Sequence, residues 1–343
     1  MNVTQRSGSR LWIWVCWTAG VYVVWAWIVF AHPGRWEAVG SHWPIAIAMA
    51  FGSFIAGSTP LGGGSVGFPI LVLMFGLPAR LGRDFSFAAQ SVGMVSASIF
   101  ILARGQSIAW PVLRGALVGA TVGLPIGLRF VAPNLDDGWT KLVFAVVCAS
   151  FGLLHLRHLN ELAAQSRTTV RSDRWDFAAG AAVGGLASCT VVATTGVGID
   201  LFVYLLLVLV CRTDLRVAVP TAVIAMAYTS VVGVAFTAST IGLAAGTVDT
   251  FLAAVPVIVV GAPIGAFVVS RIGRKLPLRV VAVLCVLQFV WIGFVERATL
   301  GPGGVVAGLG ATAVLLLGFE WLFVRSKARD AATFIEASHL RNR

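Results

Sequence analysis

Charged residues are scarce in this chain of 343 residues. Only 11% of the residues are Asp, Glu, Lys or Arg, whereas 58% are hydrophobic and the mean hydropathy is +0.91. This composition is too apolar for the surface of an ordinary soluble protein. Apolar runs that approach the roughly 20 residues needed to span a bilayer recur from Leu11 almost to Arg325. The sequence therefore predicts an all-α polytopic membrane protein with no separate soluble domain.

Residues that usually build metal, disulfide or nucleotide sites are also few. The chain has five cysteines and five histidines, no CxxC pair and no phosphate-binding loop of the GxxxxGK type. We therefore expect no metal, no cofactor, no disulfide framework and no direct use of ATP. The cysteines lie in or beside apolar runs, where they are expected to act as small hydrophobic residues: Cys16, Cys148, Cys189, Cys211 and Cys285.

Basic residues outnumber acidic ones by 25 to 14, which gives a net charge of +11. They gather in short loops between apolar runs, as they do on the cytoplasmic side of membrane proteins. We interpret the excess as a topology signal and expect no binding of nucleic acid. The apolar run that follows Arg6 and Arg10 is too long for a signal peptide, so it is expected to stay as a first span.

Loop signals divide the chain into apolar runs that predict about 10–12 transmembrane or half-membrane helices. Two of the runs, 66–77 and 199–211, have only 12 and 13 residues. As helices they would reach roughly 18 to 20 Å, which is less than the hydrocarbon thickness of about 30 Å. The runs are 11–31, 43–59, 66–77, 84–103, 108–131, 141–156, 177–194, 199–211, 216–237, 249–270, 280–296 and 303–324.

The two short runs hold matching places in two halves of the chain. The motif Gly-Leu-Pro-Ile-Gly at 123–127 returns as Gly-Ala-Pro-Ile-Gly at 261–265, and glycine breaks occur at 62–64 and 196–198. This pattern predicts an internal duplication. It divides the chain into an additional N-terminal span (1–42), a first repeat (43–157), a basic cytoplasmic linker (158–176), a second repeat (177–297) and a C-terminal span with a cytoplasmic tail (298–343).

The distribution of Lys and Arg favours a helical hairpin at each glycine break. If each short run pairs with the segment before it, 18 basic residues lie on one side and only Arg35, Arg80, Arg83 and Arg297 on the other. If each pair is instead one broken span, the division is 15 against 7. The hairpin arrangement fits the basic cytoplasmic loops better. It makes the two repeats inverted and both termini cytoplasmic, an architecture typical of secondary transporters.

The two glycine breaks are the candidate binding site. Irregular backbone inside a membrane is tolerated where protein covers it or where it lines a watery cavity. Paired breaks in inverted repeats point to a transporter binding site. A half-helix that begins after a break presents free N–H groups, which favour an anion. The candidate substrate-binding residues are Gly62, Gly63, Gly64, Ser65, Thr194, Thr195, Gly196 and Gly198.

Other polar and small residues have competing interpretations. Asp200 follows Gly198 by two positions, either as a cap for backbone N–H groups or as the coupling group for a proton or cation. The glycines at i, i+4 spacing over 115–127 are expected to serve tight helix packing. Asp84 is expected at the membrane interface, and Gln90 is expected in an interhelical hydrogen bond.

Several short motifs follow one another in both halves of the chain: Gly62, Gly63, Gly64, Pro69, Gly76, Leu77, Pro78 and Ser86 in the first, and Gly196, Gly198, Ala218 and Thr221 in the second. Over about residues 43–297 they resemble the TauE/SafE sulfite exporter family, within the toluene sulfonate uptake permease superfamily. The resemblance implies a permease for small sulfur-containing or organic anions in a bacterial cytoplasmic membrane, and it adds Ser86 and Thr221 to the candidate substrate-binding residues.

The sequence departs from the family pattern in the expected substrate region. Pro60 stands in place of the first glycine of the first motif, and residues 82–85 read Gly-Arg-Asp-Phe where the family has Ala-x-Gly-Thr. In the second half, the triple glycine becomes Gly-Ile-Asp at 198–200. The two breaks therefore differ from each other at corresponding places.

The sequence is compatible with three classes of function to different degrees. A secondary transporter would hold a small anion near the bilayer midplane between the breaks and draw energy from a proton or cation gradient. An anion channel, the alternative, would use the glycine-rich segments as a filter. An enzyme would need a nucleophile and a base on facing spans, and Ser65 has no evident histidine partner, so no enzymatic activity is expected. Membrane lipid is the expected surrounding, and the sequence assigns neither direction of transport nor oligomeric state.

Overall fold

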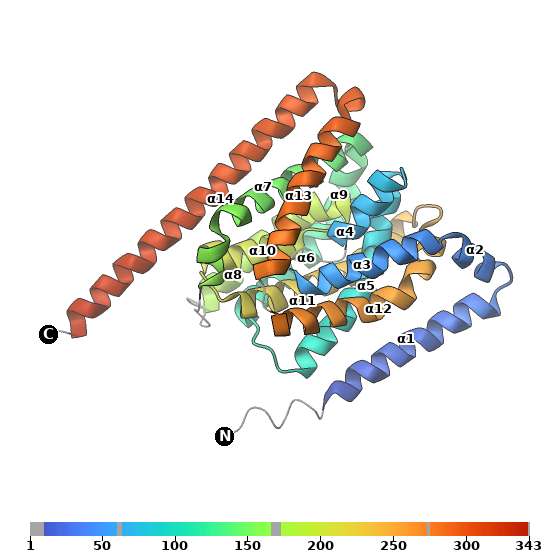
Figure 1. Cartoon of the computed structure of the whole chain (residues 1–343), viewed down its shortest axis with the longest axis horizontal. Helices are drawn as coiled ribbons and strands as arrows, with labels where there is room; N and C mark the ends of the chain where they lie inside the picture. The colour runs from blue at the N-terminus through green and yellow to red at the C-terminus, as the bar shows by residue number, and fades with distance from the viewer. Residues whose placement is uncertain (1–9, 60–63, 166–172, 273–274, 342–343) are drawn as a thin grey trace.

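Helices make up nearly all of the residues that the computed structural model describes, which are 10–59, 64–165, 173–272 and 275–341 (Figure 1). The first half contains α1 (Leu11–Ala31), α2 (Arg35–Ser41), α3 (Trp43–Ser58), α4 (Gly64–Pro69), η3 (Ile70–Met74), α5 (Ala79–Ala103), α6 (Trp110–Ile126), η4 (Gly127–Val131), η5 (Ala132–Asn134) and α7 (Asp137–Ala163). The second half contains α8 (Asp173–Ala187), η6 (Ser188–Val192), α9 (Ala193–Thr195), α10 (Ile199–Leu205), η7 (Leu206–Val210), α11 (Leu215–Phe236), η8 (Thr237–Ile241), α12 (Thr247–Ile272), α13 (Lys275–Val295) and α14 (Arg297–Arg341).

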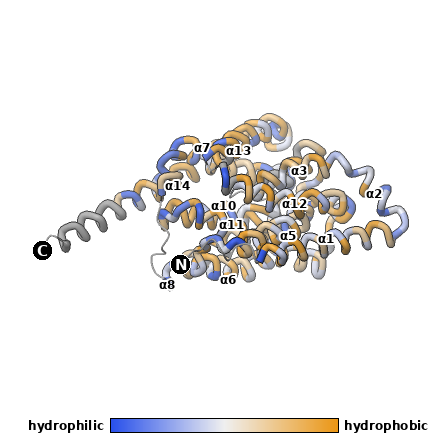
Figure 2. Tube along the Cα trace, turned by 60° about the horizontal axis from the view of Figure 1, so that its bottom comes forward, coloured by the Kyte–Doolittle hydropathy of each residue, from blue (hydrophilic) through white to orange (hydrophobic). Residues whose placement is uncertain are grey.

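Within the described ranges, nine helices are long and apolar enough to cross a membrane, or ten if the bent pair of α2 and α3 counts as one span. The stretch Ile199–Val210 is apolar but shorter. Hydrophobic residues run along α1, α6 and α12, whereas hydrophilic residues gather near α2 and the end of α7 (Figure 2). The predicted all-α polytopic membrane fold is therefore confirmed.

Two features of the helices differ from the predicted runs. The short helix α2 was not expected, and α7 continues to Ala163 although the run 141–156 ends earlier. The added turns of α7 carry polar side chains that bind α14: His158 Nε2 lies 2.8 Å from an oxygen of Glu320, and Lys327 donates to Glu161 at 2.7 Å. These residues continue the helix because a neighbouring helix supplies their partners.

The glycines at 115, 119, 123 and 127 allow α6 and η4 to lie against α8 and η6 at backbone distance. A Cβ added at any of them would overlap a backbone carbonyl, at Phe177, Ala181, Gly185 and Cys189 in turn. Such close approach is the usual role of small residues between membrane helices. The packing role that the spacing predicts for this stripe is confirmed.

The second copy of the Gly-x-Pro-Ile-Gly motif packs in a corresponding way. A Cβ at Gly261 would overlap Ser53 of α3, and a Cβ at Gly265 would overlap the carbonyl of Phe54. Thus α6 of the first predicted repeat packs on α8 of the second, while α12 of the second packs on α3 of the first. Two related repeats would pack in this reciprocal manner. The duplication and its inversion stay predictions.

The chain after the second break folds back along α8. The Cys211 Sγ lies 3.9 Å from a carboxylate oxygen of Asp176, so the end of η7 returns to the end of the bundle where α8 begins. In the first half, α4 lies beside α3, since a Cβ at Gly67 would be 3.4 Å from the sulfur of Met49. The short helices therefore form hairpins with the helices before them.

The helices α1 and α14 flank the bundle on opposite sides (Figure 1). The side chains of Tyr22 and Trp25 attach α1 to α12, donating to the carbonyls of Pro256 and Leu252 at 2.7 Å each. Between them, α5 and α11 pack against each other and are largely buried. Through Arg83 and Ser86, α5 contacts the second glycine break at Gly196.

Candidate functional site

The second break lies in the packed interior between α9 and α10. Gly196 has φ 77° and Gly198 has φ 116°, conformations that favour glycine. A Cβ at Gly196 would lie 2.5 Å from the carbonyl oxygen of Arg83 and 2.9 Å from the Cβ of Ser86. Both the backbone conformation and the close approach to α5 therefore require glycine at position 196.

The hydroxyl groups at this break donate hydrogen bonds to neighbouring backbone carbonyl oxygens. Thr194 Oγ1 lies 2.9 Å from the carbonyl oxygen of Val191, and Thr195 Oγ1 lies 2.7 Å from the same oxygen. Ser86, on the facing helix α5, donates to the carbonyl oxygen of Gly82 at 2.7 Å. Because each hydroxyl has a single proton to donate, these three predicted residues surround the break without a free donor for an anion.

Gln90 links the break to a small cavity. Its Nε2 donates to the carbonyl oxygens of Ser86 and Gly196, at 2.9 and 3.1 Å. These two acceptors fix the orientation of the amide, since only the nitrogen can donate to them. The interhelical hydrogen bond expected of Gln90 is confirmed, and its partner, the break itself, was not predicted.

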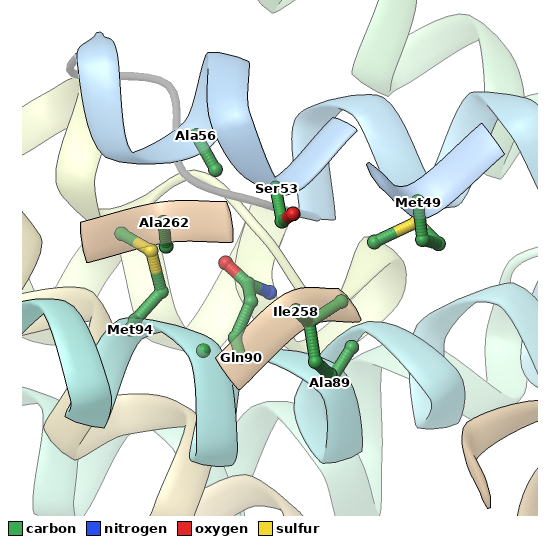
Figure 3. A pocket seen from close by; sticks show the side chains of 9 residues that line it. Met49, Ser53, Ala56, Ala89, Gln90, Met94, Ile258 and Ala262 are labelled. Carbon is green, nitrogen blue, oxygen red and sulfur yellow. The ribbon is translucent and has the colours of Figure 1, made fainter. Parts of the chain in front are cut away.

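The other end of the Gln90 amide has no partner. Its Oε1 is buried without a hydrogen bond within the described ranges. Gln90 points from α5 into the space between Met49 and Ser53 of α3 and Ile258 and Ala262 of α12 (Figure 3). The cavity there has a volume of about 10 Å³, which is about the space that one water molecule needs.

Asp200 lies in the first turn of α10 and is buried. One carboxylate oxygen, Oδ1, accepts the N–H of Leu201 at 3.0 Å, as a capping residue would. The other, Oδ2, has no partner in the described structure. Asp200 borders a second cavity of about 10 Å³, which is also lined by Gly198 of the break, by Cys148 and by apolar residues.

The carboxylate of Asp200 changes the expectation for anion binding at this half-helix. The N–H of Leu201, one of the first in α10, already has a carboxylate partner within the chain. The positive end of the α10 dipole therefore already faces a carboxylate of the protein, whose negative charge has the same sign as that of a substrate anion. An anion at this break needs donors from another element.

Part of the first break lies outside the described residues, namely Gly62 and Gly63, together with the departure at Pro60. Gly64 begins α4, and the side chain of Ser65 is likewise outside what the structure describes. The described part of α4 packs on α7 through Phe68 and Phe144, whose ring centroids lie 5.1 Å apart. Phe144 also lines the cavity at Asp200, so α7 contacts both short helices.

Thr221 is buried on α11. None of its hydrogen bonds among the described residues is formed with the second break. Its Oγ1 donates to the carbonyl oxygen of Val217 at 2.7 Å and accepts the N–H of Ala109 at 3.0 Å. These bonds hold the segment before α6. The structure thus brings Ser86, Thr195, Gly196, Gly198 and Asp200 to one region and gives Thr221 a separate set of contacts.

Residues 63–67 also fit the pattern Gly-x-Ser-x-Gly, which in hydrolases places a serine on a turn between a strand and a helix. Here Gly64 begins a helix inside a helical bundle. The buried His155 bonds elsewhere, with Nδ1 2.9 Å from the carbonyl oxygen of Phe151 and Nε2 3.0 Å from the hydroxyl of Tyr204. The pattern therefore carries no argument for a nucleophilic serine.

Comparison with known proteins identifies the family. A family model described as "Sulfite exporter TauE/SafE" matches residues 45–292. No curated protein matches the sequence. No solved structure matches it either. The family match extends from α3 into α13 and includes both glycine breaks, while α1 and α14 lie outside it. The chain belongs to the TauE/SafE sulfite exporter family and is a multi-pass membrane protein of the permease class.

Proposed function

We propose that the protein is a secondary transporter for small anions, such as sulfite, sulfonates and related organosulfur or organic anions. The family match supports a membrane permease of this kind. The observation that carries the proposed site is the buried break at Gly196 and Gly198, where irregular backbone lies among polar side chains inside an apolar bundle. Such backbone occurs in membranes where it serves a cavity or a ligand.

The substrate lies between the two breaks, near the bilayer midplane. The glycines at 62–64 and 196–198 let it approach the backbone closely, and Ser65, Ser86, Thr194 and Thr195 line its path, whereas Thr221 supports the segment before α6. Gln90 lies beside this path, where its amide nitrogen bonds the carbonyl of Gly196 and its unpaired oxygen can accept a hydrogen bond from water or from a protonated substrate. The inverted arrangement of the repeats 43–157 and 177–297 gives the site two equivalent routes of access.

Transport proceeds by alternating access. Glycine contacts hold α6 against α8 and α3 against α12 at backbone distance, and interfaces packed this closely tend to move as units. We therefore assign the movement to these two helix pairs, which shift relative to each other around the central α5 and α11. The site then opens to one side of the membrane at a time.

Asp200 is the coupling group in this proposal. Its Oδ2 is buried without a partner beside a cavity of about 10 Å³, and an ionisable group at such depth usually has a function. A proton or cation taken from the gradient neutralises the carboxylate and so changes the field at the break. The excess of basic residues in the loops supports a bacterial inner membrane location with both termini in the cytoplasm.

Binding and flux measurements test the proposed function. The purified protein is screened by thermal shift against sulfite, sulfonates, thiosulfate and small carboxylates, and then reconstituted in vesicles. Saturable flux of a stabilising anion supports the transporter. Ohmic single-channel currents would instead support the anion channel, in which the glycine-rich segments act as a filter.

A further inference from the structure

The only buried basic side chain among the described Lys and Arg residues is that of Arg83. It lies on α5 with 7% of its side chain exposed, and its own carbonyl oxygen contacts the break at Gly196. Arg83, Ser86 and Gln90 have i, i+3, i+7 spacing, so they share the face of α5 that meets the break. A buried arginine in an apolar bundle is costly and usually has a function.

The neighbouring carboxylate occupies one edge of the Arg83 guanidinium. Its Nε and Nη2 lie 2.9 and 2.8 Å from a single oxygen of Asp84, Oδ1. The other oxygen of Asp84, Oδ2, accepts the N–H of Ala244 at 2.9 Å, which fixes the carboxylate. Asp84 is fully buried within the protein, and its place at the membrane interface stays a prediction.

The second edge of the guanidinium, formed by Nη1 and Nη2, is not the edge that Asp84 occupies. Among the described residues, the hydrogen bond and the ion pair of the Arg83 side chain go to one oxygen of Asp84, through Nε and Nη2. Arginine has five N–H donors in a planar fork, and the Nη1–Nη2 edge matches two oxygens of one anion. The hydroxyls around the break have no free donor, and the first turn of α10 faces Asp200. Arg83 is therefore the described group best able to donate to an anion here.

We propose that the Nη1–Nη2 edge of Arg83, held in place by Asp84, is the selectivity element that binds substrates with two or more oxygens on one centre, the sulfonate, sulfite or carboxylate class, in preference to halides. This inference rests on the proposed function, since it assigns the cationic contact of the same site. The Arg83–Asp84 pair has no net charge when the site is empty, so the arginine is stable without substrate and the anion can leave.

Binding to the purified full-length protein tests the proposal by calorimetry, with ethanesulfonate and chloride as probes. Arg83→Lys keeps the charge but removes the planar fork. We expect it to weaken ethanesulfonate binding roughly 10- to 100-fold, the value of a charged hydrogen bond, with little effect on chloride. The matched control is Arg80→Lys, one turn earlier on α5, where the exposed arginine donates to the carbonyl of Gly242; it should change neither constant.

A second variant tests whether a loss of anion selectivity comes from the missing guanidinium or from an unpaired buried charge that disturbs folding. Arg83→Gln combined with Asp84→Asn removes both charges together, so no unpaired buried charge remains, and it too should lose the preference for ethanesulfonate over chloride. If both variants keep the preference of the unmodified protein, Arg83 has only a structural role and the inference fails while the proposed function stands. If the unmodified protein binds no oxyanion, the proposed function fails as well.

Discussion

Replacing Gly196 with alanine should destabilise the protein and impair transport together, because this residue joins the second break to α5. Its dihedrals are φ 77° and ψ 6°. In this left-handed region, the conformation of a residue with a Cβ is less favourable by about 1–2 kcal/mol. The new Cβ would also lie 2.5 Å from the carbonyl oxygen of Arg83, which is too close, and overpacking of this kind costs about 1–3 kcal/mol. The expected total is about 2–5 kcal/mol.

Gly34 offers a matched control for this substitution. Its dihedrals are nearly the same, φ 79° and ψ −11°, but the nearest atom to an added Cβ is a carboxylate oxygen of Glu37 at 3.9 Å. Gly34→Ala should therefore lose only the conformational part, about 1–2 kcal/mol. Equilibrium unfolding in mixed micelles, followed by circular dichroism, measures the free energy of both variants, and vesicle flux measures their transport.

The comparison of the two variants decides the role of position 196. We expect Gly196→Ala to unfold more readily than Gly34→Ala and to lose most of its flux, while Gly34→Ala keeps its flux. Equal unfolding free energies would refute the close contact with α5. A fully active Gly196→Ala protein would show that the backbone at this break is not part of the transport site.

Three further predictions concern Asp200 and the remaining glycines. Asp200→Asn keeps an acceptor for the N–H of Leu201 but cannot ionise, so it should change the pH or cation dependence of flux. An unchanged dependence would show that Asp200 only caps the start of α10. Gly119→Ala, which overlaps the carbonyl of Ala181, should lower the free energy of unfolding by about 1–3 kcal/mol, whereas Gly310→Ala, with open space around it, should raise it by up to about 1 kcal/mol. Gly64→Val should abolish flux without affecting membrane insertion, and unimpaired flux would make the glycines of the first break simple spacers.

The helices were largely predictable because hydropathy and glycine spacing are local signals. The run 11–31 coincides with α1, and the glycines of 115–127 pack as their i, i+4 spacing indicates. The end of α7 was not predictable from hydropathy, since its polar turns contact α14 through the ion pair of Glu161 with Lys327 and the contact of His158 with Glu320.

The contents of the candidate site were less predictable, because they depend on contacts between distant segments. Gly196 and Gly198 were identified from the repeated break, and their positive φ angles agree with that reading. The hydrogen bond from Gln90 to Gly196 joins residues 106 positions apart, and no periodic pattern in the sequence predicts it. The burial of Asp84 was not predictable either, because its sequence neighbours do not reveal that Ala244 approaches it from 160 positions away.

The most direct test of the proposed function is counterflow of sulfite in vesicles that contain the purified protein. The vesicles are loaded with unlabelled sulfite and diluted into labelled sulfite at low concentration, without any imposed ion gradient. A secondary transporter with one alternating site predicts a transient accumulation of label that saturates with concentration and is lost in Gly196→Ala. Entry of label that never exceeds equilibrium, together with an ohmic current, would contradict alternating access and indicate a channel.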